Sequence, residues 1–221
     1  MSLFYQHNIN QSTKLAIWKI EEDEAFFLSK VPLQKSITHP HKRLQHLAAR
    51  YLLQLLFPDF PYTEIVIADT NKPYLPYEQY HFSISHCGNF AAAIVSLHQR
   101  VGIDIELASD KVLKVAHKFL SKKEMQDFGV TTQNTFTTTL IHQTILLWNA
   151  KEAIFKWWGW GNINFSEEIR LQQFDIAHEG IFNAIFSKAN WVVPIEVQYK
   201  IFENLCLCWV VTDADIANRP L

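Results

Sequence analysis

Three carboxylates in the second half of the sequence, Asp104, Glu106 and Glu152, lie at positions where a negative charge is unfavourable without a nearby cation. Asp104 and Glu106 are two residues apart in an alternating segment, 101–106, so on a strand their side chains leave the same face. Glu152 lies in the apolar stripe of a predicted helix, 141–155, where a carboxylate is costly unless it is paired or bound to a cation. Such hard oxygen donors suit Mg²⁺ or Mn²⁺. The pattern indicates a metal site, with a solvated strand face as the alternative for the first two.

Lys156 lies one helical turn after Glu152, so the two side chains are neighbours on the predicted helix. Two hypotheses follow from this spacing. In the first, Glu152 and Lys156 form a buried ion pair. In the second, Glu152 is a third metal ligand and Lys156 is directed at an anionic ligand.

A hydroxyl and an imidazole end another alternating strand. Ser85 and His86 come shortly before Gly88, and such groups, together with free backbone N–H groups at a turn, can hold a phosphate. A Ser–His hydrolase is the alternative, but it requires a third member that the sequence does not reveal.

Four more residues of the first half could contact an anionic or aromatic ligand. The segment 71–76 contains two prolines and predicts a rigid turn that presents Lys72 and Tyr74. Arg43 and Arg50 are two turns apart on one face of a predicted helix. Taken singly, each of these residues is also explained as a solvated surface group.

The elements that must position these residues occur twice. Each half, 1–100 and 101–221, contains an alternating strand, the tetrapeptide Phe-Leu-Ser-Lys, a long helical pattern and an aromatic-rich strand region. These events lie at 15–21, 27–30, 44–55 and 80–97 in the first half, and at 101–106, 119–122, 141–155 and 197–212 in the second. The order favours an α+β fold made by pseudo-two-fold duplication, in which each half packs a long helix on a small, mainly antiparallel sheet. A cleft between such halves is a natural ligand site.

The composition excludes several classes of protein. The chain has 221 residues, of which 48% are hydrophobic and 19% charged, as is typical of globular proteins. Its net charge of −2 argues against a nucleic-acid binder that relies on global basicity. Three cysteines indicate a reducing compartment, and no apolar run reaches the ~20 residues of a membrane span. We therefore expect a cytoplasmic protein without a membrane or nucleic-acid partner. We also expect a monomer, although these features do not bear on the oligomeric state.

A stripe of lysines follows the strand that carries the carboxylates. Lys111, Lys114, Lys118 and Lys122 recur at helical spacing and predict an amphipathic surface helix. In a chain of slightly negative net charge, such a stripe is a candidate docking site for an acidic protein.

Together, these motifs resemble the 4′-phosphopantetheinyl transferases. The resemblance rests on segments that occur in order between about Arg43 and Lys156. They are Ser85-His86, residues 102–106, residues 119–121 with Glu124, and residues 148–153 with Lys156. The length and the apparent duplication resemble the larger, surfactin-synthetase-activating type, which is a pseudo-dimer of two similar halves.

The resemblance implies a reaction and a role for each motif. The enzyme would transfer the 4′-phosphopantetheine arm of coenzyme A to a serine of an apo acyl or peptidyl carrier protein, releasing adenosine 3′,5′-bisphosphate. Asp104, Glu106 and Glu152 would hold Mg²⁺ or Mn²⁺ on the pyrophosphate. Glu152, or a metal-bound water that it orients, would take the proton of the attacking serine, while Lys156 and His86 would neutralise phosphate charge.

By the same resemblance, the first half would supply most contacts to coenzyme A and the second half the metal carboxylates. The implied coenzyme A ligands are Arg43, Arg50, Lys72, Tyr74, Ser85, His86 and Lys156. Other candidates for the 3′-phosphate are Lys30, Lys35 and Lys42. Glu124 matches an acidic position of the family without an assigned role.

Two other functions stay open at this stage. A non-catalytic module that binds coenzyme A or a carrier protein would keep the fold but lose the carboxylates, whereas all three are present here. An Mg²⁺-dependent phosphohydrolase would use the same carboxylates with water as acceptor and would need no carrier protein.

Overall fold

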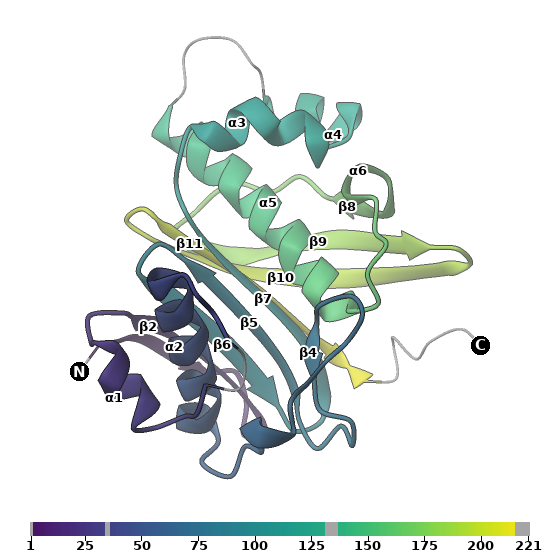
Figure 1. Cartoon of the computed structure of the whole chain (residues 1–221). Helices are drawn as coiled ribbons and strands as arrows, with labels where there is room; N and C mark the ends of the chain where they lie inside the picture. Colours follow the sequence, from purple (N-terminus) through teal and green to yellow (C-terminus); the bar gives the residue numbers. More distant parts are fainter. Residues whose placement is uncertain (1, 34–35, 131–136, 215–221) are drawn as a thin grey trace.

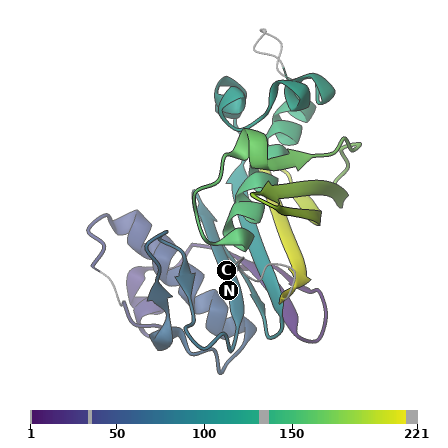
Figure 2. The ribbon, with the colours of Figure 1, turned by 90° about the vertical axis from the view of Figure 1, so that its right-hand side faces the viewer.

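The computed structural model describes residues 2–33, 36–130 and 137–214, which form two lobes joined along neighbouring strands (Figures 1 and 2). The first lobe has an antiparallel sheet in the order β1-β2-β6-β5. Its strands are β1 (Leu3–Asn8), β2 (Thr13–Lys19), β5 (His81–Cys87) and β6 (Phe90–Ser96). The short helix α1 (Glu24–Leu28) and the long helix α2 (Pro40–Leu56) cover one face of this sheet (Figure 1).

The residues His39 and Pro40 favour the start of helix α2 at this position. The ring nitrogen of His39 accepts from the backbone N–H of Lys42, and Pro40 occupies the first turn, where its missing N–H costs nothing. The helix ends at Leu56, and its C-cap residue Phe57 is extended and directly precedes Pro58. Its apolar stripe packs on β2 and β6 to form the core of the first lobe.

The second lobe also packs a long helix on an antiparallel sheet. Its antiparallel sheet has the order β7-β11-β10-β9-β8. The strands are β7 (Gln99–Leu107), β8 (Ile169–Leu171), β9 (Glu179–Lys188), β10 (Trp191–Phe202) and β11 (Leu205–Asp213). Helix α5 (Thr138–Trp158) lies across β7 and β11 (Figure 1). It is capped by the Thr137 hydroxyl and ends at Gly159, whose φ of 80° is the left-handed conformation that glycine adopts at low cost.

The remaining elements are short. They are the hairpin β3 (Val66–Ile67) and β4 (Pro73–Tyr74), the 3₁₀ helices η1 (Tyr62–Glu64) and η2 (Ala116–Lys118), and the helices α3 (Lys111–Val115), α4 (Lys122–Asp127) and α6 (Phe165–Glu168). The hairpin loop reaches the end of α5, because the Thr70 hydroxyl donates to the carbonyl oxygen of Gly159 at 3.1 Å. The first lobe therefore contacts the C-terminus of the second lobe's main helix.

The two lobes meet along β5 and β7, which belong to different sheets. Serine side chains bridge them: the backbone N–H of Ile103 donates to Ser83 Oγ at 3.2 Å, and that of Ile105 donates to Ser85 Oγ at 3.4 Å. Behind this seam, an apolar cluster from β2, β6, β7 and β11 fills the space between the two sheets.

A glycine in β7 lets α5 lie close to the seam. A Cβ on Gly102 would be 2.0 Å from the carbonyl oxygen of Ala153 and 2.9 Å from Trp157 Cβ. Only a residue without a side chain permits this approach, which brings the helix face with Glu152 and Lys156 towards β7.

The predicted mixed fold of antiparallel sheets and helices is confirmed. In each half, the strand that precedes the helices pairs with the last strand of that half: β2 with β6, and β7 with β11. The pseudo-two-fold duplication and the division at residue 100 stay predictions. Among residues 2–33, 36–130 and 137–214, no helix is long and apolar enough to cross a membrane.

The predicted continuous lysine helix is wrong. The segment is broken into α3, η2 and α4, because Ser121 caps a new helix: its hydroxyl accepts from the backbone N–H of Glu124, and the Glu124 carboxylate accepts from the N–H of Ser121. The four lysines, Lys111, Lys114, Lys118 and Lys122, are nevertheless all exposed.

Candidate active site

A cavity of about 530 Å³ opens at the seam between the lobes. We call it the cleft. Strand β5, strand β7 and helix α5 contribute its polar lining, and the hairpin loop closes one side. The predicted site residues in its wall are Lys72, Ser85, His86, Asp104, Glu106, Glu152 and Lys156. The structure thus brings together three carboxylates and several of the predicted phosphate ligands that lie far apart in the sequence.

Asp104 is the most enclosed of the three carboxylates, with only 3% of its surface exposed. Its Oδ1 accepts from Lys156 Nζ and from Ser85 Oγ, each at 2.6 Å, and Lys156 Nζ also donates to Ser85 Oγ at 2.9 Å. The ion pair of Lys156 is therefore with Asp104, not the pair with Glu152 that one sequence hypothesis proposed.

The ionised forms of the other two carboxylates, Glu106 and Glu152, are destabilised by their surroundings. Burial, with repulsion from Asp104 as the next cause, raises the pKa of both Glu106 and Glu152 to about 7. Lys156 opposes this shift at both residues. Among the described residues, Lys156 is the ammonium group that offsets the charge of all three carboxylates, and an additional cation would lower the repulsion between them.

The donor set fits a divalent cation in its chemistry. All three side chains offer hard carboxylate oxygens, and Asp104 Oδ2 is buried without a hydrogen-bond partner in the described part of the chain. In this arrangement, however, the described residues contain no group of three His, Cys, Asp or Glu side chains close enough to share one ion. The metal role of Asp104, Glu106 and Glu152 stays a prediction.

A second cavity, of about 960 Å³, adjoins the cleft at His86. We call it the basic cavity, because Lys42, His46 and Arg50 also line it. Burial lowers the pKa of Arg50 to about 10, and one guanidinium nitrogen lies 3.1 Å from His46 Nδ1. Arg50 Nε is buried with no hydrogen-bond partner among the described residues. An anion bound in the basic cavity could accept a hydrogen bond from this group.

The other cations predicted for this region are placed differently. Arg43 pairs with Glu24 through Nη2 at 2.6 Å and Nε at 2.8 Å, and also donates to the carbonyl oxygen of Ile37. It is not in the lining of the cleft or the basic cavity. Lys30 is exposed, and Lys35 lies outside the described residues.

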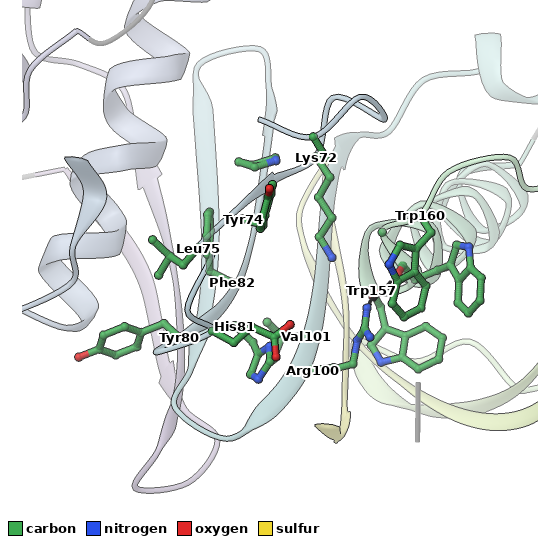
Figure 3. Close-up of a pocket in the computed structure, with 15 residues that line it drawn as sticks. Lys72, Tyr74, Leu75, Tyr80, His81, Phe82, Arg100, Val101, Trp157 and Trp160 are labelled. Atoms are coloured by element: carbon green, nitrogen blue, oxygen red, sulfur yellow. Dashed lines mark hydrogen bonds between the residues drawn. The ribbon is translucent and has the colours of Figure 1, made fainter. Parts of the chain in front are cut away.

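A third cavity, of about 270 Å³, shares Lys72 and Phe82 with the cleft. Figure 3 shows the residues that line it. We call it the tryptophan cavity, because Trp157, Trp158 and Trp160 line it. Lys72 lines both this cavity and the cleft, whereas Tyr74 lines only the tryptophan cavity. The sequence did not predict this cavity, since its walls come from segments that lie far apart along the chain.

Glu124 does not line the cleft but forms buried contacts behind it. Its carboxylate forms a buried ion pair with Lys151 at 2.8 Å, and the two side chains are only 4% and 0% exposed. The ammonium also donates to the carbonyl oxygens of Phe165 and Ile169 at 2.8 and 2.7 Å, and the carboxylate accepts from the N–H of Leu171 at 3.0 Å. Although burial lowers the pKa of Lys151 to about 8, every polar atom of the pair has a partner. This pair fixes α4 and β8 to α5, next to Glu152.

Sequence reasoning missed the apolar wall of the cleft. Trp148 and Phe155 line it, one turn before and one turn after Glu152. They lie in the apolar stripe of α5, which the sequence assigned to the core, so only the position of Glu152 in that stripe signalled that this helix face borders a cavity.

Comparisons with known proteins point to one family. Residues 100–208 match the family model described as the 4′-phosphopantetheinyl transferase superfamily. The chain is 31% identical over 166 residues to 4′-phosphopantetheinyl transferase gsp of Aneurinibacillus migulanus, which covers 73% of this chain and 64% of that protein. It is 31% identical over 96 residues to a 4′-phosphopantetheinyl transferase of Bacillus subtilis, which covers 43% of this chain and 41% of that protein. In each case the similarity spans less than two thirds of the relative's length.

Proposed function

The chain belongs, through residues 100–208, to the 4′-phosphopantetheinyl transferase superfamily, and on this premise we propose that it modifies a carrier protein. It would transfer the 4′-phosphopantetheine arm of coenzyme A to a serine hydroxyl of an apo acyl or peptidyl carrier protein. The observation that supports this most is the cleft itself, where Asp104, Glu106, Glu152 and Lys156 of the second lobe meet His86 of the first lobe.

In the proposed reaction, the serine oxygen attacks the phosphorus that bears the pantetheine arm. The bond from that phosphorus to the bridging pyrophosphate oxygen breaks, adenosine 3′,5′-bisphosphate leaves, and the serine proton passes to a base. Glu152 is the candidate base, because its carboxylate lines the cleft beside Lys156 and His86 and could accept the proton directly or orient a water that does so. Lys156 and His86 would offset negative charge on the phosphates.

We propose Asp104, Glu106 and Glu152 as ligands for Mg²⁺ or Mn²⁺. A bound ion would supply positive charge next to the pyrophosphate. This role is supported by the orphaned oxygen of Asp104 and by the raised pKa values of the two glutamates.

The basic cavity is our candidate for the nucleotide end of coenzyme A. Arg50, Lys42 and His86 line it, and its contact with the cleft at His86 would let one ligand span both. Residues 1–100 would then supply the nucleotide contacts and residues 101–221 the carboxylates, in two halves that we propose arose by duplication. The nucleotide role of Arg43, Lys72 and Tyr74 stays a prediction.

The carrier protein would dock near the exposed lysines. Lys111, Lys114, Lys118 and Lys122 follow β7 directly and stay exposed despite the break between α3 and α4. Their charge is complementary to an acidic partner. A monomeric state and a cytoplasmic location stay predictions.

One experiment separates this function from its two alternatives. The protein is incubated with coenzyme A, Mg²⁺ and an apo carrier protein, and the carrier is weighed by intact-protein mass spectrometry. A carrier that gains the phosphopantetheine mass supports transfer. An unchanged carrier with intact coenzyme A would favour a binding module, and consumed coenzyme A with an unchanged carrier would favour a phosphohydrolase.

The matched variant for this assay is Glu152→Gln, which removes the proposed base and a carboxylate charge with little change in shape. We expect it to abolish transfer while the circular dichroism spectrum stays that of the unmodified protein. Full activity of this variant would exclude the roles assigned to Glu152.

A further inference from the structure

Two hydrogen bonds join helix α5 to strand β11, the neighbour of β7 in the second sheet. Asn149 Nδ2 donates to the carbonyl oxygen of Cys206 at 2.8 Å, and Cys208 Sγ donates to the carbonyl oxygen of Leu146 at 3.6 Å. Burial raises the pKa of the Cys208 thiol well above its ordinary value, so the thiol stays protonated and able to donate. All four residues are fully buried. The helix is therefore attached to the sheet by polar groups as well as by its apolar stripe.

The β11 residues that make these bonds are the cross-strand partners of two of the cleft carboxylates. In the antiparallel ladder of β11 and β7, Cys206 pairs with Glu106, and Cys208 pairs with Asp104. Directly opposite residues carry their side chains on the same face of a sheet. Helix α5, which lies across both strands (Figure 1), is thus attached to the sheet at the same two positions that carry these carboxylates.

On the helix, the same contacts lie close to the third carboxylate. Glu152 follows Asn149 by about one turn, and Lys156 lies about one turn further along. The Lys156 ammonium pairs with Asp104 of β7 at 2.6 Å. A shift of α5 along β11 would therefore move Glu152 and Lys156 together, away from their present positions at β7. The hydrogen bond of Asn149 opposes this shift.

Stability alone does not account for the amide of Asn149. Its Oδ1 is buried without a hydrogen-bond partner among residues 2–33, 36–130 and 137–214. An unsatisfied buried acceptor lowers the stability of the folded state, and an apolar side chain at this position would avoid that loss. A buried polar group can, however, fix the register between two packed elements at such a loss.

We propose that Asn149 is a positioning residue of the transfer reaction, which fixes α5 along β11 and thereby holds Glu152 and Lys156 at the carboxylates of β7. This inference rests on the proposed function, since it assigns Asn149 to the transfer step. Asn149 does not line the cleft, so it acts through the position of the helix and not through contact with a ligand. Its loss should therefore lower the rate of transfer more than the affinity for coenzyme A.

The first test is the steady-state kinetics of transfer from coenzyme A to an apo carrier protein by the full chain. We expect Asn149→Ala to lower kcat at least about tenfold and to leave KM for coenzyme A within about twofold of the wild type, because a displacement near ~1 Å can cost about a hundredfold in rate. The matched control is Thr144→Ala. Thr144 is also fully buried on α5, but its hydroxyl donates within the helix, to the carbonyl oxygen of Leu140 at 2.8 Å. Thr144→Ala should change neither parameter by more than about twofold, and equal effects of the two variants on kcat, or a change in KM alone, would overturn the proposal.

The second test needs no catalytic activity, because it uses the ion pair between α5 and β7 as a reporter of helix position. The coupling energy of this pair is measured by urea unfolding of Lys156→Met, Asp104→Asn and the double variant, in the wild-type background and with Asn149→Ala or Thr144→Ala. We expect the coupling to fall below about half of its wild-type value with Asn149→Ala, since the attraction weakens as the charges separate, and to be unchanged with Thr144→Ala. Undiminished coupling with Asn149→Ala, or no coupling in the wild type, would overturn the proposal.

The two tests separate the failure of this inference from the failure of the proposed function. A wild-type chain that transfers no phosphopantetheine would refute the proposed function, whereas the coupling energy would still decide whether Asn149 fixes the position of α5. Should Asn149→Ala fail to fold, Asn149→Ser replaces it in both tests. The hydroxyl introduced by Asn149→Ser would donate to a carbonyl oxygen of its own helix and would not restore the bond to β11.

Discussion

The buried pair of Lys151 and Glu124 allows a sharp test of how the helices around the cleft are held. Substitution of Lys151 by methionine keeps most of the side-chain volume but removes an ammonium with 0% exposure. The change leaves Glu124 charged and buried, and it deprives the carbonyl oxygens of Phe165 and Ile169 of a donor. Removal of one partner of a buried ion pair costs about 3–5 kcal/mol of unfolding free energy.

We expect a loss of this size in urea unfolding followed by circular dichroism. At roughly 2–4 °C per kcal/mol for a chain of this length, the melting temperature of Lys151→Met should fall by about 6–20 °C. The matched control is Lys123→Met, because Lys123 pairs with Asp127 at 2.6 Å but its side chain is 80% exposed. That surface pair should contribute less than about 1 kcal/mol.

The double variant Lys151→Met/Glu124→Gln tests the cause of the loss. The glutamine introduced by Glu124→Gln would keep an acceptor for the N–H of Ser121 and would remove the uncompensated charge. The double variant should therefore lose less than the sum of the two single variants, with a coupling energy of about 2 kcal/mol or more. Additive losses, or a loss for Lys151→Met no greater than for Lys123→Met, would refute the reasoning.

Three further predictions address other parts of the molecule. Charge reversal of the exposed Lys114 and Lys118 to glutamate should raise KM for an apo carrier protein several-fold and leave KM for coenzyme A unchanged; an equal change in both would argue against docking there. Because the folded state lowers the pKa of Lys72 to about 7, it binds fewer protons than the unfolded state between pH 7 and pH 10, so the stability of the wild type relative to Lys72→Met should increase across this range. A difference in unfolding free energy that is constant between pH 6 and pH 9 would contradict this. Ser83→Ala should cost about 1–3 kcal/mol, because it leaves the buried N–H of Ile103 at the seam without its acceptor; urea unfolding with no loss would show that the bridge is dispensable.

Local periodicity predicted which faces carry the carboxylates. Alternation placed Asp104 and Glu106 on one face of a strand, and the apolar stripe singled out Glu152; all three line the cleft. The partner of Lys156 could not be predicted in this way. Helical spacing offers only Glu152, whereas Asp104, 52 residues earlier, reaches the same point because Gly102 lets α5 approach β7 closely.

The lysine segment shows a local signal that spacing alone overlooks. Ser121 and Glu124 have the capping-box spacing, so the sequence itself contained the start of a new helix within the supposed continuous one. Arg43 is a case that no local signal predicts. Its ion pair with Glu24 depends on how α1 packs on α2. Neither spacing nor composition specifies that contact.

The seam explains why the cleft needs both lobes. Ser85 belongs to β5, yet its hydroxyl donates to Asp104 of β7 and accepts from Lys156 of α5. A backbone ladder between β5 and β7 would satisfy the strands without any side chain, but it would leave no polar atom at this point. By joining the lobes through serine hydroxyls, the fold makes the contact that holds the sheets together also fix the carboxylate and the ammonium. Any displacement of one lobe against the other would therefore change the charge balance of the cleft directly.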